Sequence, residues 1–294
     1  MSVIETKGLT KHYGSTEALV DLDLEVQQGE IFGYLGPNGS GKTTTIRLLL
    51  GLIHPTRGGA EVLGMDPWRD AVGLHRRLSY LSGDLALWPS LTGAQTLEYL
   101  GSMHGTVDAA YRDELIERFS LDPSVKVRAY SRGNRQKVGI VAALMGRPEL
   151  LVMDEPTAGL DPLMEHVFRG CVHEARERGQ TVFLSSHILS EVEATCDRVG
   201  ILRGGRLVEV DSIADMRRLA AVEVEATFDG DPPSLNGVAG VQDVHVRGHT
   251  LRCKVSGPIG PLVDALAGHG LLGLTSREPS LEELFMAHYG DGAS

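Results

Sequence analysis

A glycine-rich octapeptide places the strongest constraint on the fold of this 294-residue chain. The segment matches the pattern G-x-x-x-x-G-K-[ST] and reads Gly36-Pro37-Asn38-Gly39-Ser40-Gly41-Lys42-Thr43. Glycine lacks a Cβ, so the backbone can curl until successive N–H groups point at one anion. The lysine adds a positive charge for the β- and γ-phosphates of a nucleotide, and the threonine hydroxyl can bind Mg²⁺. The octapeptide therefore predicts a loop that wraps nucleotide phosphates.

The residues on either side of the octapeptide support this interpretation. Residues 31–35 form a short apolar run that predicts a buried strand before the loop. Residues 44–50 predict the helix that follows, and a helix N-terminus favours negative charge. Thr44, at the start of this helix, is included among the expected nucleotide-binding residues. Strand, glycine loop and helix in this order are the context that the motif requires.

Two further apolar runs end in polar residues that suit phosphate chemistry. Residues 150–153 precede Asp154 and Glu155, and residues 181–186 precede His187. Both runs predict central strands of a parallel sheet, with polar groups at the edge where ligands bind. We expect Asp154 to hold Mg²⁺ through water and Glu155 to polarise the water that attacks the γ-phosphorus. His187 would hydrogen bond to the γ-phosphate, although a structural histidine that caps the next helix is the alternative.

Composition narrows the class of protein. Lys and Arg total 28 against 39 Asp and Glu, and the formal net charge of −11 argues against a nucleic-acid binder. No apolar run approaches the roughly 18 residues of a bilayer span, and the N-terminus lacks a signal-peptide layout, so we expect a cytoplasmic chain. The three cysteines are widely spaced and odd in number, which argues against a disulfide framework. Cys171 and His173 fit no common zinc spacing, which favours placement on a helix surface.

The chain divides by pattern into two predicted domains, residues 1–217 and residues 218–294. Residues 3–35 alternate in polarity and predict an antiparallel strand layer, and residues 88–146 predict a helical subdomain. The tail predicts a small α+β domain. Its expected elements are a strand at 222–228, a hairpin over 241–246 and 250–255, and helices at 262–266 and 281–289.

Across residues 3–215 the chain resembles the nucleotide-binding subunits of ABC transporters. The resemblance rests on the glycine loop, on residues 154–161 (DEPTAGLD), on Ser186-His187, and on residues 130–136 (YSRGNRQ), which match the family's signature segment. It implies an α/β fold, a P-loop NTPase of the ABC type with a parallel core sheet, an antiparallel β layer and a helical subdomain. It also implies an ATPase that uses ATP and Mg²⁺ and works as a head-to-tail homodimer or with a paired ATPase subunit.

The resemblance assigns roles to the signature segment of residues 131–134. In such a dimer the signature of one subunit closes over the ATP held by the other. Ser131 and Gly133 would donate to the γ-phosphate across the interface, with Arg132 and Asn134 in the same segment. Asp161 would lie in the stretch that links the two sites.

The resemblance also assigns a role to Tyr13, in the segment Lys11-His12-Tyr13-Gly14. This tyrosine matches the aromatic residue that stacks on adenine. Stacking of a base on an aromatic ring contributes about 1–3 kcal/mol in nucleic-acid platforms. The alternative is an ordinary aromatic residue of an edge strand, and the residues leave both interpretations open.

Two departures from the family pattern stand out. Arg132 takes the place of the first of two adjacent glycines in the signature, where it either reaches toward the partner's phosphates or lies in solvent. Gly83 takes the place of a glutamine that touches Mg²⁺ and the attacking water. We hypothesise that Asp84 substitutes for this glutamine through water. An Asp84→Ala variant with unchanged Mg²⁺ dependence and hydrolysis rate would refute that hypothesis.

These departures and the tail resemble the exporter, drug-resistance branch of the family. This branch implies a separate integral membrane permease, export of drugs or other hydrophobic compounds, and a peripheral position on the inner face of the membrane. Trp88, with Leu85 and Leu87, could dock the permease, although core packing is the default for the leucines. The alternatives are an importer subunit, a soluble ATPase acting on ribosomes or DNA, and a module that binds ATP without cleaving it. A single glycine loop, no heptad run and the acidic charge count against the soluble ATPase.

Overall fold

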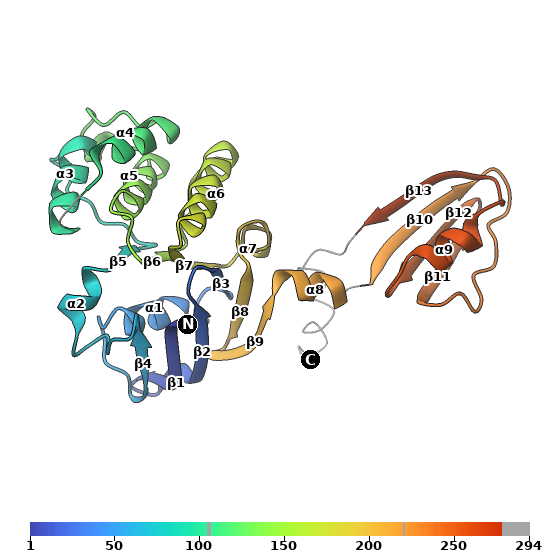
Figure 1. The fold of residues 1–294 in the computed structure, drawn as a ribbon, viewed down its shortest axis with the longest axis horizontal. Coiled ribbons are helices and arrows are strands. Elements are labelled where there is room, and N and C mark those ends of the chain that lie inside the picture. The colour runs from blue at the N-terminus through green and yellow to red at the C-terminus, as the bar shows by residue number, and fades with distance from the viewer. Residues whose placement is uncertain (105–106, 220, 278–294) are drawn as a thin grey trace. The chain divides into compact units, whose positions relative to one another are not determined.

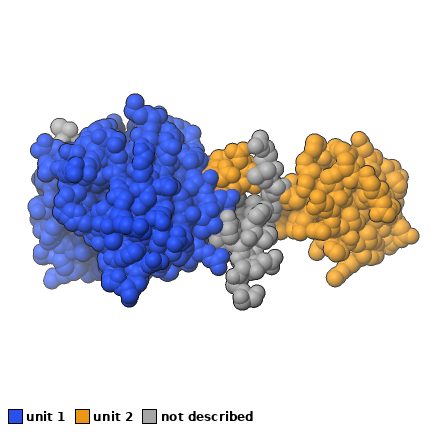
Figure 2. All heavy atoms as spheres, turned by 90° about the horizontal axis from the view of Figure 1, so that it is seen from below, with its two compact units in different colours: residues 1–210 blue, residues 211–294 orange. Residues whose placement is uncertain are grey.

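The computed structural model describes residues 1–104, 107–219 and 221–277. The chain forms two compact units, Met1–Val210 and Asp211–Ser294, which are coloured separately in Figure 2. The helix predicted over residues 281–289 lies outside the described residues. None of the described helices combines the length and the apolar composition that crossing a bilayer requires.

A six-stranded sheet in the order β5-β6-β7-β3-β8-β9 forms the centre of the first unit. Its strands are β3 (Ile31–Leu35), β5 (Leu78–Leu81), β6 (Leu150–Asp154), β7 (Thr181–Ser186), β8 (Arg198–Arg203) and β9 (Arg206–Ser212). The first five pair in parallel, and every residue of β3, β6 and β7 is buried. A strand covered on both faces needs successive apolar side chains, which explains the runs at 150–153 and 182–184. The predicted parallel core is confirmed.

A three-stranded antiparallel sheet, in the order β2-β1-β4, forms a second layer of this unit. Its strands are β1 (Ser2–Tyr13), β2 (Thr16–Gln27) and β4 (Arg57–Val62). Alternating side chains of β2 are buried, as expected for a sheet with one face on the core. The predicted antiparallel layer is confirmed, whereas β4 has no predicted counterpart because its exposed Arg57-Gly58-Gly59 start lacks apolar alternation.

Helices connect the two sheets and cover the central one (Figure 1). They are α1 (Lys42–Leu49), α2 (Ala71–His75), α6 (Pro162–Glu177) and α7 (Leu189–Thr195). Helix α1 contacts β2 and β4 on one side and β6 on the other, while α6 and α7 pack on β7 and β3. Ile46 of α1 joins Ile4, Leu22 and Phe183 in one buried cluster, so the core lies between the layers. The helix that follows the glycine loop is thereby fixed on both sides.

The predicted helical region contains three α-helices and a short 3₁₀ turn. They are α3 (Gly93–His104), α4 (Ala109–Arg118), η1 (Val127–Ala129) and α5 (Arg132–Leu144). Residues 138–144 of α5 are all buried, as the apolar run predicts. Helix α5 lies close to β5, since a Cβ at Gly139 would come within 2.6 Å of both Leu81 and Leu85.

Cys171 corrects one expectation from the sequence. It lies on α6, but its side chain is fully buried rather than on the helix surface. Helix α6 has a strongly one-sided apolar pattern, and Cys171 shares the buried side with Phe168 and Ala175. Burial raises the pKa of its thiol to about 11. Cys171 therefore behaves as a small apolar residue of the core.

The second unit contains a four-stranded antiparallel sheet in the order β11-β12-β10-β13. Its elements are α8 (Ile213–Leu219), β10 (Val222–Phe228), β11 (Val241–Arg247), β12 (Thr250–Val255), α9 (Gly260–Leu266) and β13 (Leu271–Arg277). Val224, Phe228 and Leu251 pack with Leu262 and Leu266 of α9 on one side. The expected strand at 222–228, the hairpin and the helix at 262–266 are confirmed, and β13 is an additional strand.

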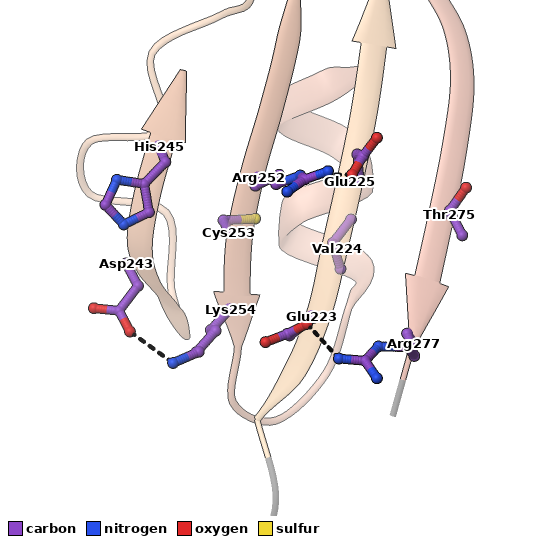
Figure 3. Close-up of a pocket in the computed structure, with 10 residues that line it drawn as sticks. All are labelled: Glu223, Val224, Glu225, Asp243, His245, Arg252, Cys253, Lys254, Thr275 and Arg277. Carbon is purple, nitrogen blue, oxygen red and sulfur yellow. Dashed lines mark hydrogen bonds and ion pairs between the residues drawn. The ribbon is translucent and has the colours of Figure 1, made fainter. Parts of the chain in front are cut away.

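The other face of this sheet is polar (Figure 3). Three ion pairs cross it between neighbouring strands: Glu223–Arg277 at 2.9 Å, Glu225–Arg252 at 2.6 Å and Asp243–Lys254 at 3.1 Å. Opposite charges on adjacent strands stabilise an antiparallel pair modestly. The charged and buried residues alternate along β10 and β12, which is the pattern that predicts strands in the tail.

Candidate nucleotide-binding site

The glycine loop has the backbone conformation that its sequence predicts. Gly39 and Gly41 have φ values of 80° and 111°, in the left-handed region that side chains disfavour. Space is also limiting, because a Cβ at Gly41 would lie 2.5 Å from the carbonyl oxygen of Ala18. Pro37 and Asn38 are exposed at the tip of the loop, and Ser40 is buried with a hydroxyl that has no hydrogen-bond partner.

Helix α1 begins at the end of this loop. Its N-cap is Gly41, which has no side chain to occupy the first free N–H groups of the helix. Thr44 lies half-buried in the first turn. Tyr34 and Thr45 hydroxyls lie 3.2 Å apart and hold β3 against α1. The arrangement leaves N–H donors and a positive helix end facing the loop, as an anion site requires.

Lys42 connects the glycine loop to Glu155, the residue that follows strand β6. Its ammonium donates to the carbonyl of Gly36 at 2.6 Å and lies 3.3 Å from Glu155 Oε1. Only 6% of Lys42 is exposed, so its charge interacts through a poorly solvated environment. A buried lysine beside several oxygen atoms is poised to meet an anionic ligand.

Asp154 and Thr43 form an oxygen-rich pair beside the lysine. The Thr43 hydroxyl donates to Asp154 Oδ2 at 2.8 Å, and Ser185 of the neighbouring strand donates to Oδ1 at 2.5 Å. Asp154 is 4% exposed, and these bonds satisfy both of its oxygens. One hydroxyl and one carboxylate at adjacent positions match the oxygen donors that Mg²⁺ prefers.

Glu155 joins the two sides of the site. Its Oε2 accepts a hydrogen bond from His187 Nδ1 at 2.7 Å, while Oε1 faces Lys42. A carboxylate only accepts, so Nδ1 of His187 carries the proton in this contact. Glu155 has φ of 49°, a conformation that costs a non-glycine residue roughly 1–2 kcal/mol. Its N–H lies 3.2 Å from the carbonyl of Ser185, which helps to hold this strained backbone.

Ser185 is a site residue that the sequence interpretation lacks. It contacts Asp154 through its hydroxyl and Glu155 through both its hydroxyl and its carbonyl. Parallel pairing places Ser185 directly opposite Asp154 in the β6–β7 register. In the sequence, Ser185 is visible only as a polar residue at the end of an apolar strand. Its role becomes clear only once the neighbouring strand is known.

The signature segment is held by local contacts. Ser131 caps α5 by accepting from the N–H of Asn134 at 3.2 Å. Gln136 donates to the carbonyl of Pro156 at 2.8 Å, and a Cβ at Gly133 would lie 2.6 Å from the carbonyl of Gly159. The start of α5 therefore packs closely on residues 156–159.

Arg132 and Asp161 lie at the surface of the same region. Arg132 is exposed, and its aliphatic carbons would be 3.4 Å from a Cβ at Gly159, so its stem crosses this glycine. Asp161 caps α6 by accepting from the N–H of Met164 at 3.0 Å. Arg132 is exposed as the second alternative expects, and its reach toward a partner's phosphates stays a prediction.

The remaining predicted residues lie at the edges of the site. Tyr13 ends β1 and is 46% exposed. Gly83 lies against Asp154, since a Cβ there would be 3.1 Å from the Asp154 carbonyl oxygen. Asp84 is exposed, and its role through water stays a prediction. Burial raises the pKa of Tyr80, on the adjacent strand β5, and the negative charge of Asp154 adds to this effect.

A phosphate loop, a buried aspartate and a following glutamate on one parallel sheet define a nucleotide-binding ATPase. The family model described as "ABC transporter" matches residues 19–158. The bacitracin transport ATP-binding protein BcrA of Bacillus licheniformis is 42% identical over 211 residues, covering 71% of this chain and 69% of the relative. The linearmycin resistance ATP-binding protein LnrL of Bacillus subtilis (strain 168) is 32% identical and covers 97% of both chains.

A solved ATP-binding subunit of an ABC transporter has the same fold, with a TM-score of 0.68 and 32% identity. The match covers 74% of this chain and 92% of that chain. Together with the relatives, it shows that the chain belongs to the ABC transporter family. The chain is an ATP-binding subunit of the exporter type and an ATPase.

Proposed function

We propose that this chain powers an export pump for drugs or other hydrophobic compounds, as a head-to-tail dimer bound to a separate membrane permease. The contact of Glu155 with both Lys42 and His187 carries the ATP-hydrolysing part of this proposal, because it joins a phosphate-binding lysine to a base and its histidine partner. The relatives named for bacitracin transport and linearmycin resistance support the class of cargo. The permease would hold the subunit at the inner face of the membrane.

Each polar group of the site has a role in this proposal. Lys42 and the N–H groups of residues 38, 39 and 41–44 bind the phosphates of ATP. Glu155 orients the attacking water and accepts its proton, and His187 holds Glu155 and the γ-phosphate in register. Phosphoryl transfer depends mainly on such positioning and on neutralisation of charge.

Mg²⁺ fits the oxygen donors beside the loop. Thr43 would bind the ion directly and Asp154 would hold it through water, since both offer oxygen atoms at one point. The ion would neutralise phosphate charge. Ser185 would keep the Asp154 carboxylate in position through its short hydrogen bond.

The signature segment completes the site from a second subunit. Ser131 and Gly133, with Arg132 and Asn134 beside them, would contact the γ-phosphate bound by the partner. Asp161 would transmit the state of one site to the other. Pairing is therefore a requirement for hydrolysis and not for ATP binding by a single chain.

An aromatic pair in the helical region is the proposed contact with the permease. Trp88 and Tyr99 are 43% and 47% exposed, and their rings meet edge to face with centroids 4.8 Å apart. Leu85 and Leu87 are half-buried beside this pair in sequence. A Trp88→Ala variant should lose co-purification with the permease while ATP binding is retained, and an exposed tryptophan elsewhere, Trp68→Ala, serves as the control. Equal recovery of the permease with both variants would contradict this contact.

Hydrolysis by wild type and a Glu155→Gln variant tests the ATPase assignment. Loss of a general base lowers the rate about 10²- to 10⁴-fold. We expect Glu155→Gln to lower the ATPase rate of the permease complex by this factor while ATP binding persists. Glu117→Gln, at an exposed position of α4, is the matched control. Equal, near-zero rates in wild type and Glu155→Gln would instead favour a module that holds ATP without cleaving it.

A further inference from the structure

The ring of Tyr13 has a cation beside it. Lys11, two residues earlier on β1, places its Nζ 5.1 Å from the centroid of the Tyr13 ring. Residues two apart on a strand lie on the same face, so this contact follows from the strand itself. An ammonium group at such a distance is attracted to the π electrons of the ring. Nearly half of Tyr13 nevertheless remains open to solvent.

The ammonium of Lys11 is itself anchored by the loop that follows α1. Its Nζ donates to the carbonyl oxygen of His54 at 2.8 Å. Thr56 of the same loop donates its N–H to the Thr10 carbonyl at 2.7 Å and accepts from the N–H of His12 at 3.0 Å. Three hydrogen bonds thus fix the loop to the end of β1. Lys11 can hold the ring in place because its own charged end is fixed.

The opposite end of α1 contacts the same hairpin. Tyr13 pairs with Thr16 across the turn between β1 and β2. Two residues further along β2, the carbonyl oxygen of Ala18 lies so close to Gly41 that a Cβ there would be 2.5 Å away. The hairpin that carries Tyr13 is therefore fixed to the phosphate loop at one end of α1 and to the His54 loop at the other.

We propose that Lys11 is a positioning residue for the base of the nucleotide. Its ammonium holds the Tyr13 ring from one face and leaves the other face for a purine to stack upon. This inference rests on the proposed ATPase function and on the stacking of adenine on Tyr13 that the family resemblance implies, and it deepens that function by adding the group that orients the ring. Lys11 acts on the base through Tyr13 and makes no contact with the phosphates.

Binding of ATP and of tripolyphosphate, both with Mg²⁺, to the full chain tests this role, because only ATP carries a base. Cation–π attraction at exposed sites corresponds to about a two- to fivefold change in a binding constant. We expect Lys11→Met to weaken ATP binding by this factor and to leave tripolyphosphate binding unchanged. Lys11→Arg should restore most of the loss. Lys7→Met is the matched control, since it removes the same charge from an exposed position of β1.

Tyr13→Ala, alone and combined with Lys11→Met, separates this inference from the proposed function. We expect the double variant to bind ATP no more weakly than Tyr13→Ala. Unchanged ATP binding in Lys11→Met, with a loss in Tyr13→Ala, would overturn the role of Lys11 alone. Unchanged binding in Tyr13→Ala would overturn the stacking role itself. A loss of tripolyphosphate binding in Lys11→Met, or an equal further loss in the double variant, would show that Lys11 acts other than through the ring.

Discussion

The phosphate side of the site and the signature segment use their polar side chains differently. On the phosphate side, side chains from a helix and two strands bind one another, as in the contacts of Asp154 with Thr43 and Ser185. In the signature segment and the nearby stretch of residues 156–161, Ser131 and Asp161 each cap the helix that directly follows them. The first arrangement brings reactive side chains into contact, whereas the second fixes the backbone conformation at the start of a helix.

This difference indicates how the two regions divide the work. The phosphate side is assembled within one chain, because the register of β6 and β7 places Asp154 beside Ser185. The signature segment offers backbone groups and exposed side chains, and these need an opposing surface to act on. Substitutions in the first region should therefore affect a single chain, and those in the second should affect only the pair.

Lys42→Ala should have the largest effect. It removes the charge that lies against Gly36 and Glu155, and each hydrogen bond to a charged group contributes about 1.5–3 kcal/mol. We expect ATP binding by the single chain to weaken about 10²- to 10⁴-fold, which corresponds to two such bonds. Calorimetry or equilibrium dialysis measures this loss. Lys137→Ala, on the signature helix, should bind ATP normally, and a Lys42→Ala variant that does the same would break the comparison.

Gly133→Val should have the opposite effect: it should weaken pairing of two chains and leave ATP binding by one chain intact. Any Cβ at this position would lie 2.6 Å from the Gly159 carbonyl oxygen, so the start of α5 must shift. We expect ATP-dependent pairing of the Glu155→Gln chain, measured by light scattering, to fall roughly tenfold, as 1–2 kcal/mol of local strain implies. ATP binding by the single chain should be unchanged. Gly170→Val is the control, because Gly170 also lies in a helix, α6, and a Cβ there would meet only the end of the Arg118 side chain, at 3.8 Å.

If Gly133→Val weakened ATP binding by the single chain as much as it weakened pairing, the two regions would not act separately. That result would mean that the shift of α5 reaches the phosphate side through residues 156–159. Gln136 is the connection that would transmit it, because its amide binds the carbonyl of Pro156. Unchanged pairing in Gly133→Val would remove the signature segment from the interface.

The sequence predicted the elements that repeat a simple pattern. The glycine loop, the parallel strands ending at Asp154 and Ser186, and the hairpin of the tail follow from spacing and polarity alone. Strand β4 was not predictable in this way, because its first three residues are exposed and it is defined by its pairing with β1. The burial of Cys171 likewise depends on which side of α6 meets the core.

Within the site, residue types were predictable and their mutual contacts were not. The ends of two strands identify Glu155 and His187, but the positive φ of Glu155 and its bond to His187 require the folded sheet. The position of Arg132 shows the same limit. Its stem lies across Gly159, a residue far along the chain that no local pattern connects to it.

The smallest expected effect concerns the link between the helical region and α6. Arg118 of α4 binds both oxygens of Glu174 on α6, at 2.8 and 2.5 Å. Hydrogen bonding to Arg118 holds the pKa of Glu174 below its usual value near 4.5, with burial opposing the shift. A carboxylate with a lowered pKa stabilises the fold above that usual value, and the contribution is lost as the pH falls through the folded pKa.

Glu174→Gln should therefore lower the melting temperature at pH 7 more than at acidic pH. The pair is partly exposed, so its contribution is about 1 kcal/mol at most, or a shift of about 2–4 °C. Melting curves recorded from pH 7 into the acid range measure this effect: the difference in melting temperature between Glu174→Gln and wild type should become smaller below pH 4.5. Glu177→Gln, three residues further along α6 at an exposed position, should show no change of this melting-temperature difference with pH. A difference that stays constant with pH would mean that packing of Glu174, rather than its charge, joins the signature-bearing region to the core.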